Sequence, residues 1–151
     1  AMFSMLSDNK KALQLMISPT LDSLRIFLHL IAAAVWVGGQ IVLGGLVPKL
    51  RKSHPEALTT TAQAFARIAW PAFAVLVITG FWNIFDTDIT ALDTSYQVTL
   101  GIKIILVAIG AIATVAHSAS PDKRVKAIGG AIGLLSSLVI FYLGILLSSA
   151  V

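Results

Sequence analysis

The stretch Leu28-His29-Leu30-Ile31-Ala32-Ala33-Ala34-Val35-Trp36-Val37-Gly38-Gly39-Gln40 carries polar side chains inside a long apolar run. A membrane-spanning helix needs about 20 predominantly apolar residues to cross a hydrocarbon core of about 30 Å. Four segments of the chain meet this requirement, near residues 24–46, 68–85, 98–117 and 127–148. The chain is therefore predicted to be an integral membrane protein.

The composition agrees with this prediction. Of 151 residues, 57% are hydrophobic and only 12% are charged, whereas about 25% of the residues of a soluble domain are charged. The apolar runs lack the alternation of a membrane barrel, so we expect an all-α fold, a four-helix transmembrane bundle over residues 21–151. Its partner is the lipid bilayer. Although the net charge is +4, we expect no nucleic acid partner, because the basic residues flank the spans.

Residues 1–20 form a separate N-terminal segment. Their apolar residues recur at helical spacing around Lys10 and Lys11, which favours a short amphipathic helix lying in the membrane interface. A frayed tail is the alternative. The segment lacks the long apolar core of a cleavable signal peptide.

The distribution of lysine and arginine predicts an orientation. The connectors after the first and third spans hold seven of the eleven: Lys49, Arg51, Lys52, Arg67, Lys123, Arg124 and Lys126. Cytoplasmic loops are enriched in such residues. We therefore expect the inner membrane of a prokaryote, with both termini outside the cytoplasm.

Small residues recur along the spans and predict close helix packing. Gly38 and Gly39 belong to the first span, and Gly129 and Gly133 belong to the fourth. Rows of small residues let helices approach closely in lipid. This pattern also suits a chain that forms a homo-oligomer or joins a larger membrane complex.

Ionisable residues at membrane depth are costly and are candidates for function. His29 and Lys103 each lie about eight ångströms below the outer boundary of their spans by the helical rise, so they could face each other. Trp82 and Asn83 end the second span on the same side. Arg67 and His117 form a separate inner set. A haem held between His29 and His117 is thus not expected.

The first span places His29, Ala33, Trp36 and Gln40 on one face, which we expect to point into the bundle. Simpler interpretations exist for each polar residue. His29 could be hydrogen-bonded to a neighbouring helix, and Lys103 could extend to the interface. Arg67 and His117 suit anchoring at the interface, and tryptophans are common there.

Several of these segments, in their order, resemble the membrane domain of the copper resistance D (CopD) family over about residues 24–120. The matching pieces are His29 to Gly39 with Trp-Val-Gly-Gly, Ala64 to Ala69, Val75 to Gly80 followed by an aromatic residue and Asn83, and Thr94-Ser95-Tyr96 ahead of Lys103. The same His, Arg and Lys pattern is similar to the HemJ-type protoporphyrinogen oxidase, a b-haem protein.

The CopD resemblance implies copper uptake or handling, with His29 as the first candidate metal ligand and Lys103 and Arg67 shaping the pathway. Cu(I) prefers thiolate and thioether ligands, but the chain has no cysteine. Met2 and Met5, ahead of the first span, are weak candidates for capturing copper. The alternatives are a b-haem redox protein with His29 as axial ligand, and an accessory subunit. A transport or binding protein is favoured over an enzyme.

Overall fold

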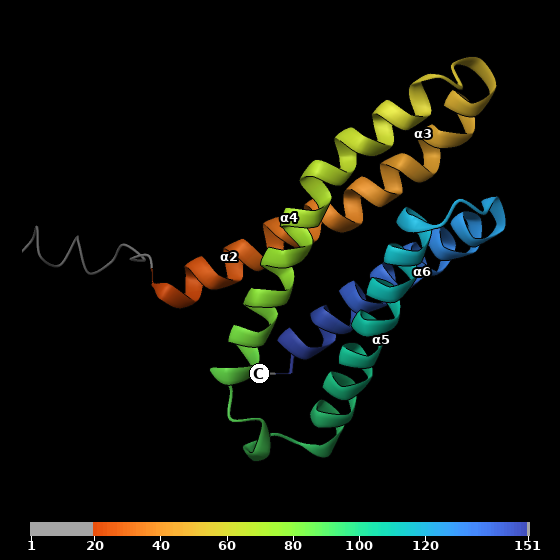
Figure 1. Cartoon of the computed structure of the whole chain (residues 1–151). Coiled ribbons are helices and arrows are strands. Elements are labelled where there is room, and N and C mark those ends of the chain that lie inside the picture. Colours follow the sequence, from red (N-terminus) through yellow and green to blue (C-terminus); the bar gives the residue numbers. More distant parts are fainter. Residues whose placement is uncertain (1–19, 151) are drawn as a thin grey trace, which may run out of the picture.

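Four helices that are long and apolar enough to cross a membrane make up most of the computed structural model, which describes residues 20–150 (Figure 1). No strand occurs within those residues. The prediction of an all-α, four-helix membrane fold is confirmed. Residues 1–19, which carry most of the predicted amphipathic segment with Met2 and Met5, lie outside the described residues.

The first membrane helix is continuous from Leu21 to Ser53 but changes its winding midway. It consists of α2 (Leu21–Ala33), the π-helical turn η1 (Ala34–Gly38) and α3 (Gly39–Ser53). Thr20 caps its start, because its hydroxyl accepts from the Ser23 amide while the Ser23 hydroxyl accepts from the Thr20 amide. The helix continues through Pro48 and past the predicted span of residues 24–46, since a proline disturbs the preceding turn and leaves the following one intact.

The remaining helices are also longer than their apolar segments. They are α4 (Ala57–Phe85), α5 (Thr94–Ala119) and α6 (Lys123–Ser148), with a short 3₁₀ turn, η2 (Ile89–Ala91), between α4 and α5. Their polar first turns extend beyond the apolar segments, as expected for the residues that lead into the second span.

The helices form two hairpins. One consists of the long first helix and α4, which packs on both α2 and α3, and the other consists of α5 and α6 (Figure 1). The two hairpins meet where η1 contacts α6. The halves of both hairpins on the side of the α4–α5 connector enclose the cavity described below.

Glycines set the closest approach inside the hairpins. A Cβ atom at Gly129 would lie 2.8 Å from the Ala113 carbonyl oxygen, and one at Gly133 would lie 3.1 Å from the Thr114 hydroxyl. A Cβ at Gly39 would overlap the Phe65 ring, whereas one at Gly38 would meet nothing within 4 Å. Thus Gly39, Gly129 and Gly133 lie at helix contacts and Gly38 does not.

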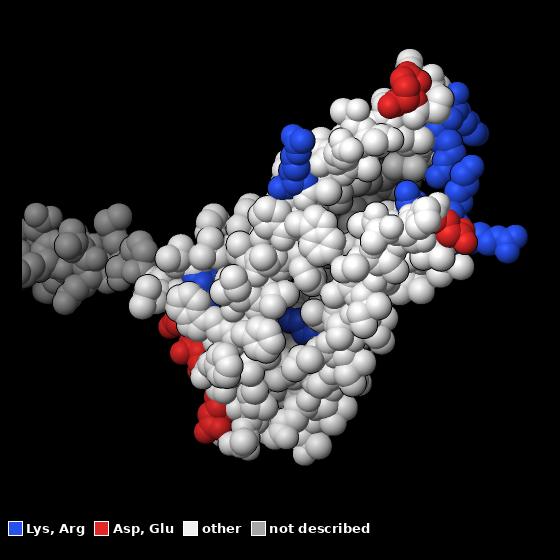
Figure 2. Space-filling model, in the orientation of Figure 1, with Lys and Arg blue, Asp and Glu red and all other residues white. Residues whose placement is uncertain are grey.

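Most charged side chains gather toward the two ends of the molecule, and the surface between them is largely uncharged apart from a few basic atoms (Figure 2). The basic residues of the α3–α4 and α5–α6 turns share one end, where both turns lie (Figure 1). The α4–α5 connector at the other end is acidic, with Asp86, Asp88 and Asp93. Large apolar side chains such as Phe27 and Ile112 are exposed on the surface between, which is the surface that a bilayer would cover.

Candidate functional site

His29 of α2 is held in one orientation by Thr79 of α4. The Nδ1 atom of His29 lies 2.8 Å from the Thr79 Oγ1 atom, and that hydroxyl donates to the Val75 carbonyl oxygen at 2.6 Å. A threonine hydroxyl has one hydrogen, so while that hydrogen is donated to Val75 the oxygen can only accept, and the contact then requires a protonated Nδ1. The neutral imidazole therefore carries its free lone pair on Nε2, as a metal-ligating histidine does.

The His29 ring lies beside Gly80, at a distance where a Cβ atom would make ordinary van der Waals contact. A Cβ atom at Gly80 of α4 would lie 3.7 Å from the His29 Cε1 atom. Thr79 is only 3% exposed, so the hydrogen bond that orients the ring is shielded from competing groups. The His29 ring is thus oriented by Thr79 and lies next to Gly80 of α4.

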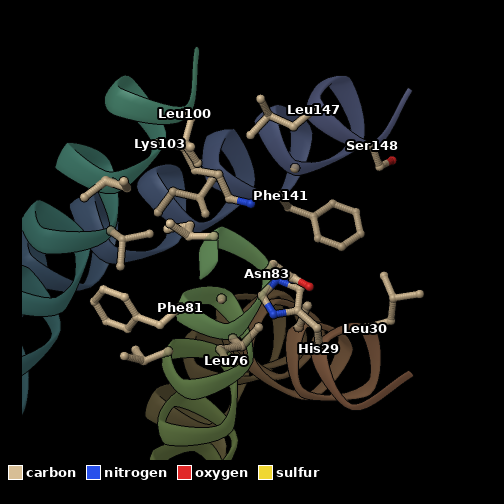
Figure 3. A pocket seen from close by; sticks show the side chains of 18 of the residues that line it. His29, Leu30, Leu76, Phe81, Asn83, Leu100, Lys103, Phe141, Leu147 and Ser148 are labelled. Carbon is tan, nitrogen blue, oxygen red and sulfur yellow. The ribbon is translucent and has the colours of Figure 1, made fainter. Parts of the chain in front are cut away.

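Lys103 of α5 extends into the same space from the opposite hairpin (Figure 3). Its Nζ atom lies against α6, where a Cβ at Gly144 would be 3.3 Å away. Gly80 and Gly144 lie five and four residues before the ends of α4 and α6. The tips of His29 and Lys103 are therefore both about 6–8 Å from helix ends by the helical rise, in agreement with the matched depth expected for these two residues.

A cavity of about 550 Å³ lies between the two hairpins, and both residues line it. Its wall is mainly apolar, with side chains of α2, α4, α5 and α6 such as Leu76 and Phe141. Asn83 lines it as well. The lining contains Arg25, His29 and Lys103 but no aspartate or glutamate. The cavity is therefore mainly apolar, and the charged residues in its lining are all basic, with Tyr96 as a further polar group.

Arg25 lines the cavity near the start of α2 and is 9% exposed. Its guanidinium group pairs with Asp86 of the α4–α5 connector and lies 3.4 Å from Asp22, while the Trp82 ring centroid is 6.0 Å away. Arg25 was not among the candidate site residues predicted from the sequence. An arginine near the start of an apolar helix, on the side of an acidic connector, is the signal that could have identified this pair.

The four residues predicted on one face of the first span do not all line the cavity, because part of this face makes a packing contact instead. His29, Ala33 and Trp36 line the cavity, and Gln40 does not. Both Trp36 Nε1 and Gln40 Nε2 donate to the Ser137 hydroxyl of α6, at 3.1 and 3.2 Å. Trp36 thereby connects the two hairpins at the inner end of the cavity.

Arg67 and His117 do not belong to this cavity. Both are exposed, and the His117 Nδ1 atom bonds to the Lys126 carbonyl oxygen near the α5–α6 turn. Trp82 contacts Arg25 but does not line the cavity. Within residues 20–150, no group of three or more His, Cys, Asp or Glu side chains could hold a metal ion. The cavity therefore offers a single imidazole.

These features define a multi-pass helical membrane protein with one partly polar cavity between two hairpins. The family model described as copper resistance protein D (CopD) matches residues 59–150. The chain belongs to that family. The matched region covers α4, α5 and α6, including the fourth span, and stops short of α2 with His29. Searches of curated proteins and of solved structures returned no match.

Proposed function

We propose that this CopD-family membrane protein handles copper, and that the His29 Nε2 atom is the contact for the ion. The observation that supports this most directly is the Thr79 hydrogen bond, which keeps the Nε2 lone pair available in the cavity. Imidazole is a good copper ligand. A hydrogen bond from the other ring nitrogen orients a ligating histidine and commonly raises its affinity for the metal.

A single imidazole suits transient contact better than storage. An ion that passes through a membrane protein must be bound weakly enough to leave. Met2 and Met5 precede α2 in the chain, and their thioethers are proposed to capture copper before it meets His29. Uptake is the direction that this arrangement favours, since both methionines and His29 are proposed to lie toward the outer side.

Copper binding by purified protein tests this proposal. At a fixed concentration of free Cu(I), and without washing, we expect His29→Ala to hold about one tenth of the copper held by the wild type or less. His54→Ala and His117→Ala are matched controls, because both histidines lie outside the cavity, and they should hold wild-type amounts. Equal copper in His29→Ala and wild type would contradict the proposal.

A b-haem redox function is the second candidate, and the cavity favours it. The residues fit such a group in part: His29 would hold the iron, Lys103 would pair with a propionate, and the walls are apolar. Haem would supply electron transfer when bound. Arg67, the other basic residue singled out in the spans, lies outside the cavity and is not a partner for the same haem. An absorbance spectrum of protein produced with ample haem tests this, since a Soret band lost in His29→Ala is expected and its absence from wild type rejects the candidate.

A role as an accessory subunit or homo-oligomer is a further proposal, supported by the largely uncharged outer surface (Figure 2). Measurement of the mass of the complex in mild detergent tests it. A monomer without a co-purifying partner would count against it.

A further inference from the structure

We propose that the cavity binds an amphipathic lipid anion, whose negatively charged head pairs with Lys103 and whose apolar body lies between the hairpins. The shared chemistry is an oxyanion on an acyl chain, either the carboxylate of a fatty acid or the phosphate of an anionic phospholipid. This inference goes beyond copper handling, because it depends on Lys103 and the cavity walls and not on metal binding.

The charge of the cavity selects an anion. Arg25 is already paired with Asp86, but the Lys103 Nζ atom has no hydrogen bond or ion pair within residues 20–150. None of the residues that line the cavity is acidic. An unpaired ammonium group at membrane depth is costly, and a ligand oxyanion would remove that cost by a charge-assisted hydrogen bond.

The cavity is open to the bilayer. Large apolar residues that line it are only partly covered by the rest of the protein, with exposed fractions of 42–57%: Leu30, Phe81, Ile104, Phe141 and Ile145. Figure 2 shows a hollow in the largely uncharged side of the molecule, with basic atoms at its floor. A ligand with an apolar body can therefore enter sideways from the lipid, without crossing water.

The depth of Lys103 fits the head of a lipid. Its Nζ atom lies at the level of Gly144, one turn from the end of α6, which places it about 6 Å from the helix end. Lipid heads lie near this boundary, with acyl chains extending toward the bilayer centre. The apolar residues around Trp36 at the inner end would then contact the chain.

A bound oxyanion would also affect the chemistry at His29. An uncompensated ammonium group in the same cavity repels a cation, and the repulsion is strong in a medium of low dielectric constant. Pairing of Lys103 with a lipid anion cancels that charge. The lipid would thus occupy the cavity whether or not copper is bound.

Quenching of Trp36 fluorescence tests the inference on metal-free protein. In a Trp70→Phe/Trp82→Phe background, Trp36 is the remaining tryptophan. The protein, in a non-ionic detergent, is titrated with 9,10-dibromostearic acid and with its methyl ester, which has the same body and no charge. We expect half-maximal quenching by the acid at about tenfold lower concentration than by the ester, the effect of a charged hydrogen bond.

Variants of Lys103 provide the controls. Lys103→Met should abolish the preference for the acid, and Lys103→Arg should keep it because the charge remains. Dibrominated phosphatidylglycerol against phosphatidylcholine distinguishes the two sources, since a preference there without one for the free acid assigns the head to a phospholipid.

Three results would overturn the inference. The first is equal quenching by acid and ester together with no preference for phosphatidylglycerol. The second is a preference for the acid that persists in Lys103→Met. The third is a haem Soret band, which would show that haem occupies the cavity. If Lys103→Met fails to fold, the acid and ester titrations of the wild type and of Lys103→Arg still decide.

Discussion

A threonine fifty positions along the chain from His29 determines what that histidine can do. Thr79 donates its hydroxyl hydrogen to the backbone of its own helix and accepts from His29 Nδ1. The choice of tautomer therefore comes from a backbone carbonyl of α4 by way of the Thr79 hydroxyl. The interpretation of His29 as a histidine bonded to a neighbouring helix and its interpretation as a ligand are compatible, because each uses a different ring nitrogen.

Substitution of Thr79 by valine should separate these roles. Thr79→Val keeps the shape of the side chain but removes the acceptor, so the His29 proton is free to move to Nε2. We expect a mixture of tautomers in the ¹⁵N NMR spectrum and about a tenfold loss of bound copper at the same free Cu(I) concentration. Thr79→Ser restores the hydroxyl and should behave as wild type. A single Nδ1-protonated form in Thr79→Val would contradict the assignment.

The α5–α6 hairpin shows how small residues replace a conventional core. The structure has no large side chain below 2% exposure among residues 20–150, and its buried residues include Gly110, Ala113, Gly129 and Gly133. In lipid, close packing of helix backbones supplies the attraction that the hydrophobic effect supplies in water. The turn η1 adds a polar contact to this packing, because it holds Trp36 against Ser137.

Alanine at Gly129 is expected to disrupt this hairpin. A Cβ atom there would meet the Ala113 carbonyl oxygen at 2.8 Å, and since backbone cannot yield locally, α5 and α6 must separate at a cost of about 1–3 kcal/mol. Gly101→Ala is the matched control, because a Cβ there meets nothing within 4 Å. Thermal unfolding in detergent should show a lower midpoint for Gly129→Ala alone. Equal midpoints would refute the packing argument.

At the scale of the molecule, the distribution of charge and the chain topology indicate the same orientation in the membrane. Both basic turns share one end, and the acidic connector lies at the other (Figure 2). Basic segments are retained in the cytoplasm. The chain is therefore proposed to place the α4–α5 connector, and the end of the cavity near Arg25, on the outer side.

Single cysteines can test this orientation cleanly, because the chain contains none. In intact cells, a membrane-impermeant maleimide should label Thr90→Cys in the connector. It should label Ser53→Cys, at the end of α3, only after the membrane is permeabilised. The reverse pattern would invert the proposed orientation.

The sequence by itself determined the class of fold and the depth of its polar residues. Twenty-residue apolar runs can satisfy their backbones in lipid only as helices, and the fixed rise of a helix converts residue number into depth. His29 and Lys103 were therefore expected at one level, and Arg67 and His117 at another. The continuation of the first helix beyond Pro48 was not expected, because a proline permits a helix to end without requiring it.

Only the tertiary structure decided which of these residues meet. Depth specifies position along a helix but not the rotation of one helix against another, so Thr79 next to His29, Asp86 next to Arg25 and Ser137 next to Trp36 required packed helices. The same packing leaves Lys103 unpaired in an apolar cavity. Pairing between helices depends on side-chain shape across long sequence separations, which local pattern does not encode.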